Sequence, residues 1–358
     1  MRPGCKPSFL ATVGLILVAC TATPTQESTP TEFSTPKILP TPSQESIPTA
    51  VSVPTILPTP SSIVPLEERL IATIDIKFPD ELVFVQGFIW VKTDDGHLIQ
   101  VDPATNSVVS DITVDTTTDY RAHFCQGLGT DGQDIWACSA RGDADNKIID
   151  VVRIDPSSQT IIATTEVGKI FDQFTMPFLL NHIWVLTDNG NKLVGIDITT
   201  DQPGSAIDLG ARCFQVAAMG SSLLVTCKLD NLLLQVDPES MQVTERRTFS
   251  SPWNIAMTED GIWVGQRNAV VRLDSESLEP VTTFTSLPGD KGLFSTREAV
   301  WVRLDDGFLY RIDPVTNRLV EQIISDQRFY NMGSVFVTPD DIWTTAGDDD
   351  MLLRLSLE

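Results

Sequence analysis

The chain has 358 residues, of which 48 are acidic and 25 are basic, so its formal net charge at pH 7 is −23. Such an acidic chain has no basic stripe to neutralise phosphates, and nucleic acid and anionic membrane faces are therefore excluded as expected partners. Beyond its N-terminal segments the chain keeps about 290 residues, which are ample for one large domain.

Residues 1–20 are predicted to be a processing signal. Two basic residues precede an apolar run from Phe9 to Ala19, which is too short to span a bilayer. The run ends in Leu17-Val18-Ala19-Cys20, which resembles a bacterial lipobox. The resemblance implies cleavage before Cys20, lipid attachment at this residue, and an extracytoplasmic place on the bacterial cell membrane. An ordinary signal peptide beside a chance cysteine is the alternative.

Residues 21–66 are rich in Thr, Pro and Ser and have almost no aromatic side chains. Such a segment buries too little apolar surface to order itself, so it is predicted to be disordered. Frequent proline keeps it extended, which suits a tether that holds the remaining domain away from a membrane. Its composition is also that of O-glycosylated stalks.

Residues 67–358 contain a repeated phrase of the form Gly/Asp-x-Ile-Trp-Val. Six of the seven tryptophans lie in it, a degenerate copy is centred on Leu224, and Trp253 lies outside it. The seven copies are 38 to 48 residues apart, and self-similarity at such a period indicates repeated structural units. The copies are centred on Trp90, Trp136, Trp184, Leu224, Trp263, Trp301 and Trp343.

A second pattern follows most copies, as in Arg311-Ile312-Asp313-Pro314, and then comes a turn and a short polar-apolar stretch. Pro and Asn suit turns, and short β-branched alternations suit strands. Each repeat therefore predicts four antiparallel strands: an apolar strand A, strand B with the Trp, strand C ending at the Asp, and an outer strand D. Four-stranded sheets repeated radially form a β-propeller.

The seventh repeat ends at Glu358 without a strand D. The stretch from Arg69 to Ile76 resembles the strand D of the second repeat, so it is expected to complete the last blade. The predicted fold is therefore all-β, a seven-bladed β-propeller of four-stranded antiparallel blades over residues 67–358, closed by an N-terminal strand. Closure removes an exposed sheet edge, which would invite aggregation.

Four cysteines fall in the predicted propeller. Each pair joins the start of strand A to the end of strand B in one repeat, and these ends are neighbours in an antiparallel sheet. We therefore predict two disulfides within blades, as an oxidising compartment permits. Zinc is the alternative, although no Cys-x-x-Cys unit occurs. The predicted pairs are Cys125–Cys138 and Cys213–Cys227.

The predicted binding site is the central funnel, onto which the segments leading into the seven A strands converge. These segments carry charged, polar and aromatic side chains that core packing does not require. The mixture suits a polar ligand or a peptide, and a solvated pore is the alternative. The candidates are Tyr120, Arg121, His123, Asp172, Gln173, Arg212, Trp253, Asn254, Lys291, Arg328 and Tyr330.

No cofactor is expected, with calcium or magnesium as the alternative. The B–C loop from Arg141 to Lys147 has oxygen ligands at alternate positions, which calcium prefers, but it has no later Glu at EF-hand spacing. Of the three histidines, the pattern lets His97 and His123 face the funnel, while His182 is expected on the opposite face. Aspartates crowd the other B–C loops in ordinary turn sequences.

The combined pattern, an apolar strand, Gly-x-Ile-Trp-Val and Arg-Ile-Asp-Pro-x-Thr, resembles the streptogramin lyase-like and YVTN propeller repeats over residues 69–358. The lyases imply a magnesium-dependent elimination that uses His and Glu, but this chain has no His after His182. The SMP-30/gluconolactonase group, similar in fold, implies a metal held by Glu, Asn and Asp, for which Glu81, Asn254 and Asp290 are candidates.

These observations leave three functions open. The preferred one is a membrane-anchored propeller that binds a ligand or protein partner through its funnel and catalyses nothing. A metal-dependent lyase or lactonase is the second, and a structural surface protein is the third.

Overall fold

The computed structural model describes residues 54–56, 59–117, 125–143, 145, 147–169, 173, 175–259, 261–289, 292–304, 308–327, 329 and 332–358. The predicted signal, Cys20 and most of the predicted tether lie outside these residues. Within the described part of the chain, no helix has the length and apolarity that crossing a membrane requires. Val51–Glu358 form one compact unit.

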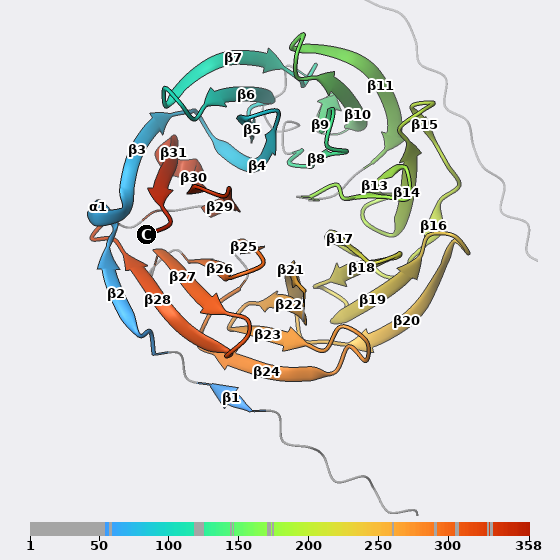
Figure 1. Cartoon of the computed structure of the whole chain (residues 1–358). Helices are drawn as coiled ribbons and strands as arrows, with labels where there is room; N and C mark the ends of the chain where they lie inside the picture. Colours follow the sequence, from blue (N-terminus) through green and yellow to red (C-terminus); the bar gives the residue numbers. More distant parts are fainter. Residues whose placement is uncertain are drawn as a thin grey trace, which may run out of the picture. The chain divides into compact units, whose positions relative to one another are not determined.

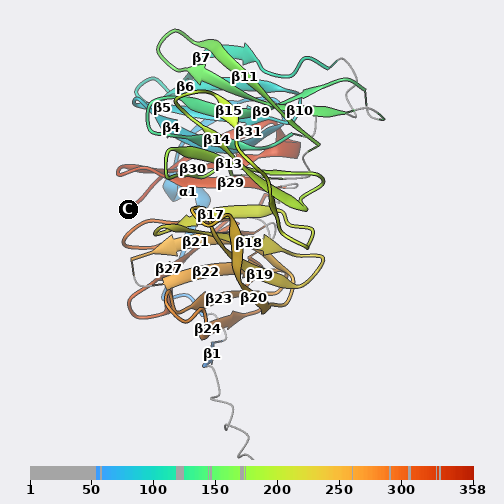
Figure 2. The same cartoon turned by 90° about the vertical axis from the view of Figure 1, so that its right-hand side faces the viewer.

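Seven sheets of mainly antiparallel strands surround a common centre (Figure 1). Figure 2 shows the same ring from its side. The predicted all-β fold with seven four-stranded blades is confirmed. The helical pieces are α1 (Leu66–Arg69) and the 3₁₀ turn η2 (Gly347–Asp349).

The strands of the first four blades follow the chain order. Blade 1 contains β4 (Pro79–Val85), β5 (Phe88–Thr93), β6 (His97–Asp102) and β7 (Ser107–Thr113). Blade 2 contains β8 (Leu128–Thr130), β9 (Ile135–Arg141), β10 (Ile148–Asp155) and β11 (Thr160–Gly168). Blade 3 contains β12 (Phe178–Leu179), β13 (His182–Thr187), β14 (Lys192–Asp197), and an outer strand in two pieces, β15 (Gln202–Pro203) and β16 (Ile207–Asp208). Blade 4 contains β17 (Gln215–Met219), β18 (Ser222–Cys227), β19 (Leu232–Asp237) and β20 (Gln242–Thr248).

The last three blades also take strands from the N-terminal side of the chain. Blade 5 contains β21 (Pro252–Thr258), β22 (Gly261–Gln266), β23 (Ala269–Leu273), β24 (Pro280–Thr285) and β1 (Thr55–Ile56). Blade 6 contains β25 (Gly292–Ser295), β26 (Val300–Leu304), β27 (Phe308–Asp313), β28 (Arg318–Ile324) and β2 (Ser62–Pro65). Blade 7 contains β29 (Met332–Val337), β30 (Asp341–Ala346), β31 (Met351–Ser356) and β3 (Leu70–Asp75).

The ring closes in blade 7, as the sequence predicts. Strand β3 pairs antiparallel with β31, with Thr73 opposite Leu353 and Ile74 opposite Leu352. Ile74 is 5% exposed and packs in a cluster with residues of blade 1, among them Ile89. The closing strand therefore joins the two ends of the propeller through both hydrogen bonds and apolar contact.

The ordered domain begins earlier than the predicted boundary at residue 67. Strand β1 adds to the outer edge of β24 in parallel, and β2 adds to β28 in the same way. Arg69 in α1 then forms an ion pair with Glu321 on β28. Proline suits such an edge strand because its missing N–H can face away from the sheet. Composition alone predicted disorder here because it ignores the open edges that the blades offer.

Hydrophobic clusters fill the seven boundaries between adjacent blades. Each repeat tryptophan lies in the cluster that its own blade shares with the next one, and Leu224 takes this place in blade 4. Trp90, for example, packs against Leu128 and Ile135 of blade 2. The repeat tryptophans are at most 3% exposed. Removing a side chain of this size from a core costs about 3–5 kcal/mol, so these tryptophans contribute strongly to the contacts between blades.

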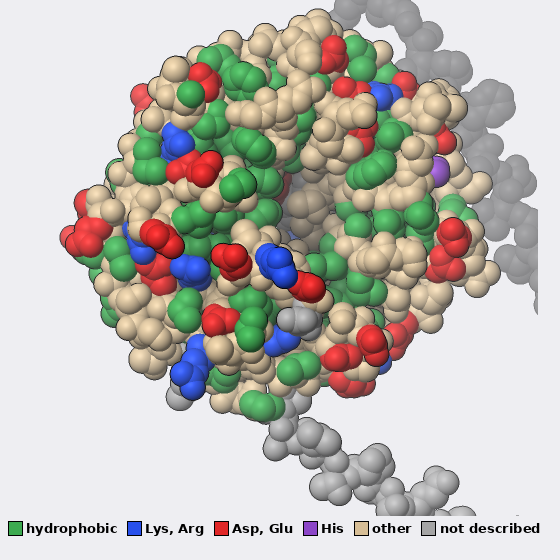
Figure 3. Space-filling model, viewed as in Figure 1, with side chains coloured by type: hydrophobic (Ala, Val, Ile, Leu, Met, Phe, Trp, Pro, Cys, Tyr) green, Lys and Arg blue, Asp and Glu red, His purple; other side chains and the backbone are tan. Residues whose placement is uncertain are grey.

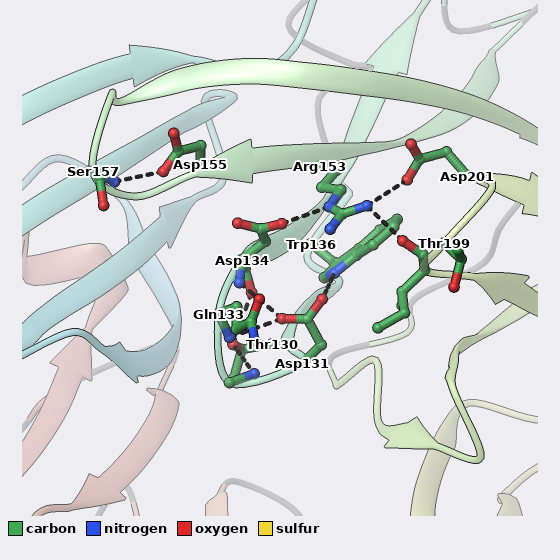
Figure 4. A network of polar contacts seen from close by, with 12 residues as sticks. Thr130, Asp131, Gln133, Asp134, Trp136, Arg153, Asp155, Ser157, Thr199 and Asp201 are labelled. Atoms are coloured by element: carbon green, nitrogen blue, oxygen red, sulfur yellow. Dashed lines mark hydrogen bonds and ion pairs between the residues drawn. The ribbon is translucent and has the colours of Figure 1, made fainter.

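A strand-C arginine adds a polar connection to this apolar contact. Arg153 lies opposite Trp136 in the register of β9 and β10, and its guanidinium carbon is 5.2 Å from the ring centroid. Its Nη1 donates to the carbonyl of Ile198 (2.6 Å) and to Oδ1 of Asp201 (3.0 Å) in the next blade. Its Nε donates to Asp134 Oδ2 at 2.6 Å (Figure 4). We call this arrangement the Arg–Trp latch.

The latch recurs at two other boundaries. Arg272 lies over Trp263 at 5.7 Å and donates to the carbonyl of Pro314 and to Oδ1 of Asn317, both at 2.7 Å. In blade 7, Arg354 lies over Trp343 at 5.1 Å. It donates to the Pro103 carbonyl and, at 2.7 Å, to Asn106 Oδ1 of blade 1. The last latch therefore spans the point at which the ring closes.

The turn that receives the latch is shaped by the Asp of the second sequence pattern. The Asp155 carboxylate accepts the Ser157 N–H at 2.8 Å, which makes the Asx turn that this residue favours. Hydrogen bonds from the Ser158 hydroxyl and the Ser157 N–H lower the pKa of Asp155 below its usual value. Four residues after the Asp, Asn106 and Asn317 have positive φ, which Asn tolerates, and their side chains face the latch.

Candidate functional site: the central channel

A channel runs at the centre of the ring and is lined by the innermost strand of all seven blades. Its cavity measures about 470 Å³, and Figure 3 shows the hollow that it forms on the face presented there. About half of the residues that line the wall are apolar. They are Pro79, Leu82, Val83, Leu128, Met176, Pro177, Phe178, Trp253, Leu293, Phe294, Val335 and Phe336.

One sector of the channel carries two carboxyl groups from blade 1, one buried and one partly buried. Glu81 on β4 is 8% exposed, and its burial raises the pKa to about 7 against the lowering effect of hydrogen bonds from Ser334 and the Leu82 backbone. Asp94 follows β5, and burial raises its pKa as well. Gln126 Nε2 donates to Asp94 Oδ1 at 3.2 Å, which favours the charged form. This sector can hold a proton or a cation near neutral pH.

A buried lysine stabilises the same sector from behind. Lys92 is 0% exposed, and its Nζ lies 3.8 Å from Asp115 Oδ1 and 3.1 Å from the Thr93 carbonyl. Asp115 in turn accepts the Ala140 N–H of blade 2 at 3.0 Å. The positive charge of Lys92 lowers the pKa of Asp94, opposing the larger effect of burial. Because both side chains of the Lys92–Asp115 pair are buried, we infer that the pair stabilises the channel wall and does not bind a ligand.

In the sector formed by blades 4 and 5, Trp253 lines the cavity and is backed by an aromatic ring and two cations. The Phe214 and Trp253 rings stack, with centroids 6.4 Å apart and planes at 23°. Lys228 Nζ lies 3.0 Å from the Trp253 centroid and 4.0 Å from the Phe214 centroid. The guanidinium carbon of Arg212 also lies 5.8 Å from the Phe214 centroid. We call Arg212, Phe214, Lys228 and Trp253 the Trp253 cluster.

Each disulfide lies directly behind one of these two sectors. Cys213–Cys227 joins the residues that precede Phe214 and Lys228, so it ties together two of the three chain segments of the Trp253 cluster. The Cys125–Cys138 disulfide fixes the residue next to Gln126, and Gln126 is the residue that donates a hydrogen bond to Asp94. Both predicted pairs are present. Their position shows that they fix the segments around the channel as well as the blades themselves.

The structure brings together only part of the predicted site. Trp253 and Asn254 line the cavity, and Arg212 belongs to the Trp253 cluster. Asn254 also donates to the Gly289 carbonyl at 3.2 Å, which holds blade 5. The remaining candidates lie outside the described residues, except Gln173: they are Tyr120, Arg121, His123, Asp172, Lys291, Arg328 and Tyr330.

Gln173 is a wall residue in the structure and not a channel-facing group. It is 2% exposed, and its amide donates to the carbonyls of Thr175 and Trp184 and accepts the Leu186 N–H at 2.6 Å. All of these partners are backbone groups of blade 3. The side chain therefore replaces the short β12 as the hydrogen-bond partner of β13.

His97 does not face the funnel, which corrects the expectation from its predicted loop position. It begins β6, and its Nδ1 lies 2.7 Å from Asp111 Oδ1 on the outer strand β7. The loop between β5 and β6 ends before His97, so this residue belongs to the sheet and not to the loop. His182 begins β13 and donates through Nδ1 to the Leu180 carbonyl at 2.7 Å.

Sequence reasoning missed several groups that the structure places here. Lys228 follows Cys227, and Phe214 follows Cys213, so the disulfide prediction already brought these two residues together. Glu81 was considered only through a family resemblance, and Asp94 only as a turn residue. Their burial depends on contacts between blades 1, 2 and 7, which no local pattern contains.

The described residues contain no group of three or more His, Cys, Asp or Glu side chains placed to hold a metal ion. In the loop considered for calcium, Asp143 accepts the Asp145 N–H at 3.0 Å, as in a turn, and Arg141 pairs with Asp150 at 2.8 Å. Residues 144 and 146 of this loop lie outside the described part.

Solved structures share this architecture. The β-propeller domain of Cps50 (Swd1) from Myceliophteria thermophila has a TM-score of 0.64 at 14% identity, covering 81% of this chain and 99% of that one. The WD40 β-propeller domain of Doa1 has a TM-score of 0.62 at 11% identity, covering 81% of this chain and 97% of that one. No family model and no curated protein matches the chain. At these identities the likeness shows the β-propeller fold alone.

The raised pKa of Glu81 makes a prediction for stability. The folded-state pKa of about 7 lies above the ordinary value of 4.5, so the folded chain binds this proton more tightly than the unfolded chain. The resulting stability is complete below about pH 4.5 and is lost as pH rises through 7. Relative to Glu81→Gln, the wild type should therefore lose up to about 3 kcal/mol of unfolding free energy across this range.

Urea unfolding at pH 4.5, 6 and 7.5 measures this difference, with both disulfides intact. Parallel pH profiles for wild type and Glu81→Gln would show that the carboxyl group is not buried in the channel wall.

Proposed function

We propose that this chain is an extracytoplasmic, lipid-anchored propeller that binds a ligand or partner segment in its central channel without catalysing a reaction. The observation that carries this proposal is the polarity of the channel. Carboxyl groups at Glu81 and Asp94 line one sector, and Trp253 lines another, with the other residues of the Trp253 cluster behind it and apolar side chains between the two sectors. A ligand with an anionic end, a cationic or hydrogen-bond-donating end and an apolar middle complements this arrangement.

A peptide segment is the ligand class that fits best. Arg and Trp carry binding energy when they are partly desolvated, and Trp253 and Arg212 are both half-buried. The disulfide behind them fixes their backbone before a ligand arrives, which reduces the entropy lost on binding. An elongated ligand can contact several of the inner strands at once.

The membrane part of the proposal rests on the sequence before residue 54. Leu17-Val18-Ala19-Cys20 resembles a lipobox, and the residues between Cys20 and β1 are rich in Pro, Thr and Ser. At roughly 3 Å per residue, this tether reaches about 100 Å when extended. Attachment of two acyl chains gives stable anchoring where one chain gives only marginal binding. The two disulfides suit the oxidising side of a membrane.

The repeat type is proposed to be that of the YVTN and streptogramin lyase-like propellers, on the residues given above. A metal-dependent lyase or lactonase remains the second candidate, because Glu81 and Asn254 line the same cavity. Their third candidate partner, Asp290, lies outside the described residues, so the described part does not supply the three ligands that such a centre needs. We therefore derive no reaction step through a metal.

The binding proposal predicts that Trp253→Ala and Arg212→Ala each weaken binding at least tenfold while the melting temperature changes little. A displayed library of random peptides, selected on the lipid-free wild-type propeller, supplies the probe. Retention of the selected peptides is then measured on both variants and on Leu229→Ala. Leu229 is 59% exposed beside Lys228 and lies outside the Trp253 cluster, so it is the matched control.

Undiminished retention on both variants would move the binding surface away from the channel. Metal analysis of protein purified without chelator tests the second candidate. One tightly held divalent ion per chain, lost in Glu81→Gln, would favour the enzyme over the binding protein.

Anchoring predicts that Cys20→Ser releases the propeller from membranes or leaves an unprocessed precursor. Membrane fractionation with a mass measurement of the mature chain checks this outcome. The lipoprotein assignment fails if the variant still fractionates with membranes at the mature mass.

A further inference from the structure

The Arg–Trp latch is interrupted at the boundary between blades 3 and 4. Trp184 is present there, but the residue opposite it in the register is Gly195 and not arginine. The position that receives the latch is Met241, whose φ of 59° matches that of Asn106 and Asn317. The tryptophan and the turn are thus both in place, and the strand-C position between them carries no cation.

Among the described residues, three other boundaries lack a complete latch. Between blades 6 and 7 the cation is present, because Arg311 lies opposite Trp301 and over its ring at 5.6 Å. The other two are filled in different ways. In blade 1, Gln100 lies opposite Trp90 and accepts the amide of Gln159 from the next blade at 2.8 Å. In blade 4, Leu224 packs with Leu278, and the boundary is apolar. Neither a hydrogen bond like that of Gln100 nor an apolar contact like that of Leu224 forms at Gly195, because glycine has no side chain to contact blade 4.

A surface cavity of about 450 Å³ occupies this position. Trp184, His182 and Gly195 form its wall on blade 3, and Pro238, Glu239 and Met241 form its wall on blade 4. In the latches, arginine donates to the carbonyl of the residue that directly follows the turn Asp, and Pro238 is the corresponding residue here. Glu239 is exposed and adds a carboxylate.

The hydrogen-bonding groups around the cavity favour an incoming donor. A carbonyl oxygen can only accept, so His182 Nδ1 carries the hydrogen in its contact with Leu180, and Nε2 of the neutral ring is an acceptor. A Cβ placed on Gly195 would lie 3.1 Å from both the His182 Cδ2 and Trp184 Cη2 atoms. The Cδ2 atom of the histidine therefore lies beside the space where the arginine stem would start.

We propose that this cavity binds the guanidinium group of an arginine side chain supplied by another peptide or protein segment. The incoming group completes the latch from outside: it lies against Trp184, donates to the Pro238 carbonyl and pairs with the Glu239 carboxylate. A planar guanidinium meets these three requirements together, because it can lie flat against a ring while it donates along its edge. The site is separate from the central channel and does not depend on the binding proposed there.

The test uses N-acetyl-L-arginine amide as the probe and the indole N–H signals of the ¹⁵N-tryptophan-labelled propeller as the readout. Trp184→Phe assigns the Trp184 signal. We expect a saturable shift of this signal with the arginine probe and none with N-acetyl-L-citrulline amide, which has the same shape without the charge. An equal response to both probes, or no response to either at tens of millimolar, overturns the proposal.

Two variants locate the site. Gly195→Arg supplies the missing arginine from the chain itself and should abolish the shift. Glu239→Gln should weaken binding by about fivefold or more, because it removes the carboxylate while keeping the exposed turn. Glu276→Gln is the matched control, since Glu276 holds the same place in the turn of blade 5, beside Leu224 and not beside a tryptophan. Unchanged binding in Glu239→Gln contradicts the proposal even if Gly195→Arg fails to fold.

Discussion

The contact on which this propeller depends is made at the boundaries between blades, where a strand-B tryptophan, or Leu224 in blade 4, is buried against the next blade. Where a strand-C arginine covers that ring, its guanidinium also bonds to the turn of the neighbouring blade, as Arg354 does with Asn106 across the closing boundary. Apolar burial gives the larger energy but little direction, whereas the guanidinium bonds fix how one blade sits on the next. A ring needs both, because an angular error at one boundary accumulates over all seven.

The geometry of the channel is determined by these boundaries between blades. Each inner strand is held by two neighbouring interfaces, so its axis-facing residues occupy fixed places around the cavity. The two disulfides add a second constraint at the segments around Gln126 and around Phe214 and Lys228. Burial then gives the carboxyl of Glu81 a pKa of about 7, while Lys228 lies over two aromatic rings. Rigid walls that present opposite chemistries across an apolar space suit recognition of an elongated ligand.

The sequence predicted the repeat, the blade number, the closing strand and both disulfides, because each leaves a periodic or paired signal along the chain. It predicted the site less well. Trp253 and Arg212 stood out since an apolar strand does not require them, but Gln173 proved to be a wall residue and His97 an outer-sheet residue. Gln173 is a wall residue because β12 is only two residues long, and His97 is a sheet residue because β6 begins there. The repeat pattern does not predict strand ends to within one or two residues. The pairing of β1 and β2 with blades 5 and 6 was also missed, because composition says nothing about which sheet edges are open to an added strand.

A double-mutant cycle on Arg354 and Asn106 tests the role of the latch most directly. Unfolding free energies are measured in urea for the wild type, Arg354→Gln, Asn106→Gly and the double variant; glycine keeps the positive φ of residue 106. The account predicts a coupling energy of about 1–3 kcal/mol between the two residues, since the bond joins a charged donor to the first blade across the closing boundary. Additive effects, within about 0.3 kcal/mol, would contradict the claim that the latch connects the blades.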